Sequence, residues 1–151
     1  PLIDRDFFSV APAAAKFLKS ESKEFIRIFN WNRGAMFAEL KAGAGLQKDS
    51  NSYYRLIEYL PEDQPSIYKI HAFWGYDTLI NYRLADYRAA VLKSGNNFKL
   101  LKIAGVNYII TDSILPVDAA NADTAAVFNN RIFIYNLTSA AHCFIVLINI
   151  N

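Results

Sequence analysis

The sequence predicts an α/β or α+β fold, with a single mixed β-sheet of about five or six strands and two or three helices packed on it. Three passages carry this prediction. Residues His71 to Leu79 resemble a strand, a glycine turn and a helix, and residues Leu100 to Thr111 resemble a helix, a glycine stop and a buried strand. Asn129-Asn130 separates two strand-like runs and favours a β-hairpin.

Size and composition place the chain among ordinary globular domains. Its 151 residues suit one domain, and 53% hydrophobic residues, with 11 Phe and 9 Tyr, exclude disorder. The longest apolar run, Cys143 to Ile148, is strand-sized, so no membrane span is expected within this segment. We expect residues 1–151 to form a single soluble domain.

Charge and cysteine content exclude several classes of partner. Sixteen basic and fourteen acidic residues give a net charge of +2, and they are scattered along the chain, which argues against a nucleic-acid partner. A lone cysteine, Cys143, forms neither an internal disulfide nor a thiolate metal cluster. The two histidines have no companions at chelating spacing, so no metal and no cofactor is expected.

The amino-terminal half begins with a helix expected from Ser9 to about Glu21, with Pro12 in the first turn, where a missing amide donor costs nothing. The run from Glu24 to Phe29 has strand composition, and Arg27 is expected to leave its apolar face. Short apolar runs with flanking turn formers predict two more strands and a loop: strands from Tyr53 to Leu60 and from Ile67 to Ala72, with a loop from Pro61 to Pro65 between them.

The helix with the clearest periodicity is expected between Tyr76 and Ser94. Asp77 stands where a carboxylate caps the first turn. Apolar residues then recur at i, i+4, i+7 and i+11, the pattern of a helix that lies on a sheet. The residues expected to pack are Ile80, Leu84, Tyr87 and Val91.

A second, shorter helix carries Phe98, Leu101 and Ala104 and stops at Gly105. The strand that follows, Val106 to Thr111, is apolar on both faces, which predicts a central position in the sheet.

The carboxyl-terminal third is expected to hold a loop and three strands. The loop covers Asp112 to Thr124, and the hairpin pairs Ala126 to Phe128 with Arg131 to Leu137. Phe144 to Ile148 has the composition of a last strand.

Four segments resemble a known arrangement. They are Phe25 to Ile28, Tyr68 to Leu79 with its Gly-Tyr-Asp turn, Leu100 to Thr111 with Gly-Val-Asn, and Val127 to Tyr135. Over Phe25 to Val146 the chain resembles the extracytoplasmic carboxyl-terminal domain of YfhO-type bacterial membrane proteins, which are related to the GT-C class of lipid-linked sugar transferases. Where that family continues with Leu-Pro-Arg-Ala, this chain has Ser139-Ala140-Ala141-His142-Cys143, a segment without the family's arginine.

The resemblance implies a non-catalytic domain that assists glycan or lipid-linked sugar transfer on the extracytoplasmic face of the cell membrane. Its partners would be the remainder of a polytopic parent protein and a glycan or lipid-linked sugar. The chain starts at Pro1 without an initiator Met, which fits a fragment of a longer protein.

Five residues are candidates for ligand contact, and each has a structural alternative. Trp74, Tyr76 and Asp77 surround the glycine turn, where an aromatic face can stack on a sugar ring. Core packing is the commoner role of such aromatics, and helix capping explains Asp77 more simply than ligand contact. His71 is a candidate general acid, and Arg27 occupies the position of the family's early-strand arginine. The wider aromatic platform would include Phe73, Tyr82 and Tyr87.

No catalytic constellation is present in the sequence, so no catalytic residue is assigned. There is no Gly-x-Ser-x-Gly elbow, and Gly43-Ala44-Gly45 lacks the Lys-Ser/Thr pair of a phosphate loop. Two alternatives stay open: a small enzyme that uses Asp77 and His71, and a nucleotide or small-ligand module at the ends of the strands.

Overall fold

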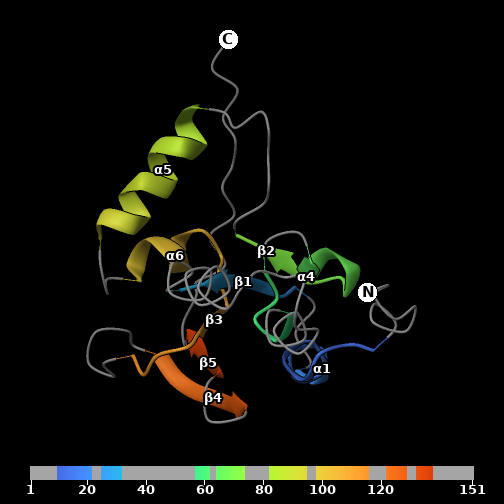
Figure 1. Ribbon diagram of the computed structural model, residues 1–151. Coiled ribbons are helices and arrows are strands. Elements are labelled where there is room, and N and C mark those ends of the chain that lie inside the picture. Colours follow the sequence, from blue (N-terminus) through green and yellow to red (C-terminus); the bar gives the residue numbers. More distant parts are fainter. Residues whose placement is uncertain are drawn as a thin grey trace, which may run out of the picture.

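The computed structural model describes residues 10–21, 25–31, 57–61, 64–73, 82–94, 98–115, 122–128 and 132–137. Within these ranges it is an α/β fold with a mixed five-stranded sheet and four helices (Figure 1). The predicted fold class is therefore confirmed. Two predicted elements lie outside the described residues: the turn at Gly75 and the strand from Phe144 to Ile148.

The sheet has the order β2-β1-β3-β5-β4. Strands β1 (Arg27–Asn30), β2 (His71–Ala72) and β3 (Tyr108–Thr111) are parallel, with β1 in the middle. Strands β5 (Ile132–Leu137) and β4 (Ala122–Phe128) continue the sheet in antiparallel pairing. All four residues of β3 are buried, which confirms the prediction of a central strand.

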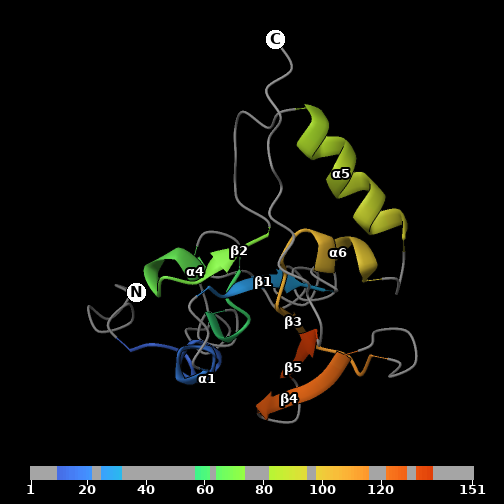
Figure 2. The ribbon, with the colours of Figure 1, turned by 180° about the vertical axis from the view of Figure 1, so that it is seen from behind.

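Helices cover both faces of the sheet, as the views from the two sides show (Figures 1 and 2). Helix α1 (Ala13–Ser20) packs on one face, where its buried residues join Ile28, Tyr108 and Ile134 in one core cluster. Helices α5 (Tyr82–Lys93) and α6 (Lys99–Ile103) belong to the opposite face, where Val91 and Leu101 join Phe29 and Ile109.

The antiparallel pairing expected for the hairpin and the glycine stop are confirmed, whereas the Asn129-Asn130 connection lies outside the described residues. Strands β4 and β5 pair along their length, with a register irregularity between Thr124 and Ala126. Gly105 has φ +73°, which reverses the chain after α6 without the steric cost that a side chain would carry. Strand β4 begins at Ala122, so the expected loop from Asp112 to Thr124 ends earlier than predicted.

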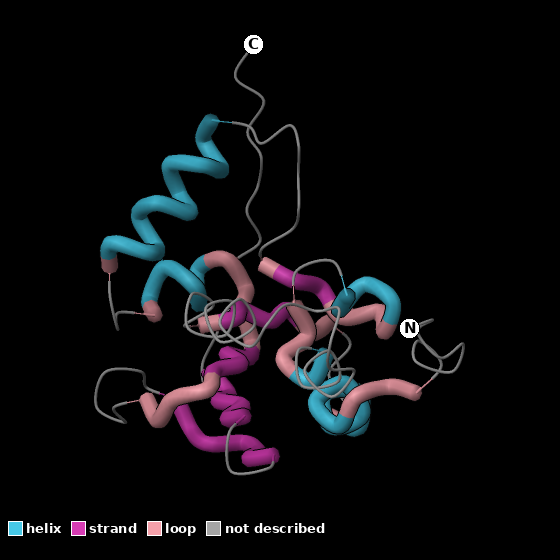
Figure 3. Tube along the Cα trace, viewed as in Figure 1, coloured by secondary structure: helices cyan, strands magenta, loops and turns pink. Residues whose placement is uncertain are grey.

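Two strand predictions are wrong in the described residues (Figure 3). Ile57 and Glu58, expected in a strand from Tyr53 to Leu60, are helical, and Leu60 takes a left-handed φ of 50°. A short apolar run does not distinguish a buried strand from a buried turn of helix. Asn30 stabilises the observed conformation, because its side-chain amide donates to the carbonyls of Tyr59 and Leu60.

The strand expected from Ile67 to Ala72 is reduced to β2, because α4 (Gln64–Ile67) takes its first residue. Pro65 is tolerated near the start of a helix, where its missing amide is not needed. Lys69, with φ 58°, then separates helix from strand.

Helix α5 forms, but the predicted packing of Leu84 on the sheet is wrong. Leu84 is 38% exposed, and every residue from Tyr82 to Asp86 is exposed. Only the carboxyl half of the helix reaches the core, through Tyr87, Arg88 and Val91. Figure 1 shows the reason: α5 runs away from the sheet beyond α6. Ile80 and the proposed cap, Asp77, lie outside the described residues.

Candidate functional site

Two of the five sequence-predicted contact residues, Arg27 and His71, lie within the described residues. Arg27 and His71 begin β1 and β2, so they lie at the amino edge. Trp74, Tyr76 and Asp77 follow β2 in the chain and lie outside the described residues, so their side chains are not placed. Phe73, directly after β2, is the last described residue before them.

At the amino edge, Arg27 and His71 are register partners on adjacent parallel strands. Neighbouring strands are about 4.8 Å apart, and aligned residues project to the same face of the sheet. Phe25 joins the two: the His71 ring stacks on the Phe25 ring at 4.5 Å, and the Arg27 guanidinium carbon lies 5.0 Å from the centre of that ring. We call Phe25, Arg27 and His71 the amino-edge cluster.

Arg27 is held in place by its backbone and by its side chain. The Asn107 side-chain oxygen accepts from the Arg27 amide at 2.9 Å, and the Asn107 amide donates to the Arg27 carbonyl at 2.8 Å. Its Nη1 donates to the carbonyl of Ala104, at the end of α6. The alternation of β1 takes Arg27 off the face of Ile26 and Ile28, as expected, but its side chain is half-buried because the other face is covered as well.

The carboxyl edge carries a chain of aromatic rings on the α5 and α6 face. Ring centres are 5.1 Å apart for Phe98 and Trp31, 5.9 Å for Trp31 and Phe29, and 5.6 Å for Phe29 and Phe73. Phe73 and Tyr87 complete the series at 6.2 Å. We call these five residues the aromatic cluster, and Trp31, Phe73 and Tyr87 are its half-buried members.

The aromatic cluster matches only part of the platform expected from the sequence. Phe73 and Tyr87 do come together, and Tyr87 is fixed by a hydrogen bond to the Leu100 carbonyl. Burial also raises the pKa of the Tyr87 phenol above its usual value. Tyr82 is exposed on α5, and its ring contacts Arg83 instead.

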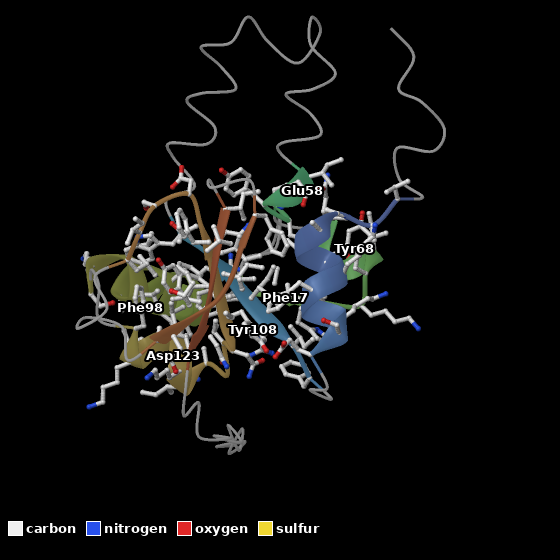
Figure 4. All side chains as sticks on the ribbon, turned by 90° about the horizontal axis from the view of Figure 1, so that it is seen from below. Phe17, Glu58, Tyr68, Phe98, Tyr108 and Asp123 are labelled. Carbon is white, nitrogen blue, oxygen red and sulfur yellow. The ribbon has the colours of Figure 1, made fainter. Side chains whose placement is uncertain are left out.

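Sequence reasoning missed Trp31 and Phe98. Trp31 follows β1, so it reaches the same carboxyl edge as Phe73, which follows β2. The sequence alone could not indicate that Trp31 and Phe73 lie at the same edge, because this depends on the parallel pairing of β1 and β2. Phe98 precedes α6, and Figure 4 shows it on the side of the sheet opposite α1.

The strand order reverses between β1 and β3, because β2 lies on one side of β1 and the next strand in the chain, β3, lies on the other. Open α/β sheets commonly bind ligands at such a point. Here its polar groups are used internally. Thr111 is fully buried, and its hydroxyl lies 3.1 Å from the Ser113 hydroxyl and accepts from the Ser113 amide. The Asn30 amide is bound to two carbonyls. This arrangement does not favour the nucleotide-module alternative.

The described residues contain no group of three or more metal-ligating side chains. In the same ranges, no helix is long and apolar enough to cross a bilayer. Comparison of the chain with protein-family models, with curated proteins and with solved structures found no match.

Proposed function

We propose that this chain is a non-catalytic domain that binds a saccharide, and that it serves a membrane-bound sugar-transfer protein of the extracytoplasmic face. One observation supports the binding part: the aromatic cluster leaves Trp31 and Phe73 half-buried at the carboxyl edge, next in sequence to Trp74. Aromatic faces pack against the apolar faces of pyranose rings, and rings held by other rings lose little freedom on binding.

The absence of catalysis is part of the proposal, and the surroundings of His71 support it. In the part of the chain that the structure describes, the His71 imidazole makes no hydrogen bond and no ion pair. A general acid or base is normally oriented by a second polar group, and here His71 is oriented by the Phe25 ring.

The saccharide proposal is tested by titrating the purified domain with cell-wall glycan fragments and following tryptophan fluorescence. Trp31→Ala and Phe73→Ala should each weaken binding, whereas Tyr82→Ala, an exposed aromatic outside the aromatic cluster, should not. Unchanged fluorescence with every fragment, or equal weakening by all three substitutions, would reject saccharide binding at this edge.

The setting in a membrane protein rests on the resemblance of Phe25 to Val146 to YfhO-type domains. Its test is topological. In cells that carry the parent gene, a protease that does not cross the membrane should cut this domain from outside. Protection until the membrane is permeabilised would place the domain on the other side and remove the proposed location.

A further inference from the structure

We propose that the amino-edge cluster binds an anion of the phosphate class, free or esterified, through the guanidinium of Arg27 and the imidazole of His71. This site lies at the opposite ends of the strands from the aromatic cluster, so it does not depend on saccharide binding there.

The first step of the argument is that the cation at this edge forms no ion pair with a carboxylate of the described residues. Arg27 is half-buried, and it forms no ion pair in the described part of the chain. One of its five N–H donors binds the Ala104 carbonyl, and the others have no hydrogen-bond partner among the described residues. A partly desolvated cation without a counter-ion is costly, and a bound anion offsets that cost.

The second step is that the donors are held in place before any ligand arrives. Two hydrogen bonds from Asn107 fix the backbone of Arg27, and Ala104 fixes one end of its guanidinium. His71 is fixed by the hydrogen bond that its backbone amide donates to the Ile26 carbonyl and by the stacking of its ring on Phe25. Donors that are already ordered lose little freedom on binding, which favours affinity.

The third step concerns the kind of anion. The planar fork of a guanidinium matches the oxygens of phosphate or carboxylate, with two parallel hydrogen bonds. One such fork already engages both oxygens of a carboxylate. A phosphate has further oxygens for a second donor, and His71 supplies one on the neighbouring strand, at the aligned position. Two nitrogen donor groups on one face therefore favour phosphate.

The test is calorimetric titration of the domain with inorganic phosphate, with glucose 1-phosphate and with phosphatidylglycerol vesicles. Arg27→Gln should lower phosphate affinity about tenfold or more, since a hydrogen bond to a charged group is worth about 1.5 to 3 kcal/mol. The matched control is Arg83→Gln, because Arg83 also lies against an aromatic ring, that of Tyr82, but far along α5. It should leave phosphate affinity unchanged.

The three ligands separate the sources of the phosphate group. Binding of inorganic phosphate with equal or weaker binding of the esters assigns the site to the free ion, and tighter binding of glucose 1-phosphate or of the vesicles assigns it to a sugar ester or a lipid headgroup. Absence of binding in all three arms overturns the proposal, as does equal weakening by Arg27→Gln and Arg83→Gln.

If Arg27→Gln does not fold, two further variants, His71→Ala and Arg27→Lys, still test the proposal. His71 is exposed and contributes to the fold through its backbone, so His71→Ala should fold and should weaken phosphate binding severalfold. Arg27→Lys keeps the charge but loses the fork, so it should bind phosphate more weakly than the native chain and more tightly than His71→Ala combined with Arg27→Lys. Native affinity in His71→Ala and in Arg27→Lys overturns the proposal.

Discussion

Helices α1 and α5 lie on opposite faces of the sheet, and the shorter of the two is docked more deeply. Three of the eight residues of α1, Ala14, Ala15 and Leu18, have no exposed surface. Of the twelve residues of α5, two are buried. The comparison shows that the length and periodicity of a helix do not set how closely it packs.

Two features of α1 explain its close packing. Alanines at its contact surface let the helix axis approach the sheet, and Figure 4 shows Phe17 and Tyr108 between the helix and the strands. Both ends are also tied to other elements: Glu58 accepts from the Ala14 amide at 3.4 Å, and the Tyr108 hydroxyl donates to Glu21 at 3.0 Å. Helix α5 is held near its middle, where the Tyr87 hydroxyl donates to the Leu100 carbonyl.

Among the substitutions that compare the two helices, Leu18→Ala in α1 is expected to lower the unfolding free energy most. Leu18 is fully buried in the core cluster that includes Ile28 and Tyr108, so its truncation should cost about 2 to 5 kcal/mol of unfolding free energy. Chemical denaturation of the purified domain measures it. A cost below that range would mean that α1 is docked less firmly than its burial indicates.

Val91→Ala probes the docked half of α5 and should cost about 1 to 3 kcal/mol, less than Leu18→Ala because fewer buried methyl groups are removed. Val91 is 1% exposed and packs with the Phe98 and Leu101 cluster. The measurement is again the denaturation midpoint. If Val91→Ala were neutral, Val91 would not help to hold α5 on the sheet, and the contacts of Tyr87 with Phe73 and Leu100 would carry that role.

Tyr108→Phe removes the hydrogen bond that joins β3 to Glu21 at the end of α1. It should lower the unfolding free energy by about 1 to 2 kcal/mol at neutral pH, because a hydrogen bond to a carboxylate is lost. Burial, and then the Glu21 carboxylate, raise the pKa of the Tyr108 phenol far above its unfolded value of 10.0. A raised pKa means stability that is complete below pH 10 and is lost as pH rises further. The native chain should therefore lose stability above pH 10 more steeply than the variant, as followed by circular dichroism. Equal slopes would contradict this.

Sequence reasoning succeeded where one local pattern decides the structure. Successive apolar residues, Tyr108, Ile109 and Ile110, form the central strand, and Gly105, with its positive φ, follows the end of α6. It failed at Glu58 and at Ile67, because a short apolar run does not distinguish helix from strand. At Glu58 the helical turn has distant partners, since the Ala14 amide donates to the Glu58 carboxylate and Asn30 donates to the Tyr59 carbonyl.

The candidate site shows the same limit. Arg27 and His71 were each singled out from the sequence, but their alignment depends on the parallel pairing of β1 and β2, which no local pattern encodes. The Phe25 ring that joins them was not singled out at all, although its place two residues before Arg27 puts both on one face of an extended chain.

The smallest effect is expected from Leu84→Ala in the projecting half of α5. Periodicity alone predicts a core position and a cost of about 2 to 5 kcal/mol. At 38% exposure Leu84 loses less surface on folding, and alanine favours the helical backbone, so we expect a cost below about 1 kcal/mol. Denaturation of Leu84→Ala beside Val91→Ala, on the same helix, measures the difference directly. A cost for Leu84→Ala equal to or above that for Val91→Ala would mean that the amino half of α5 packs in solution, and the contrast between α1 and α5 would then disappear.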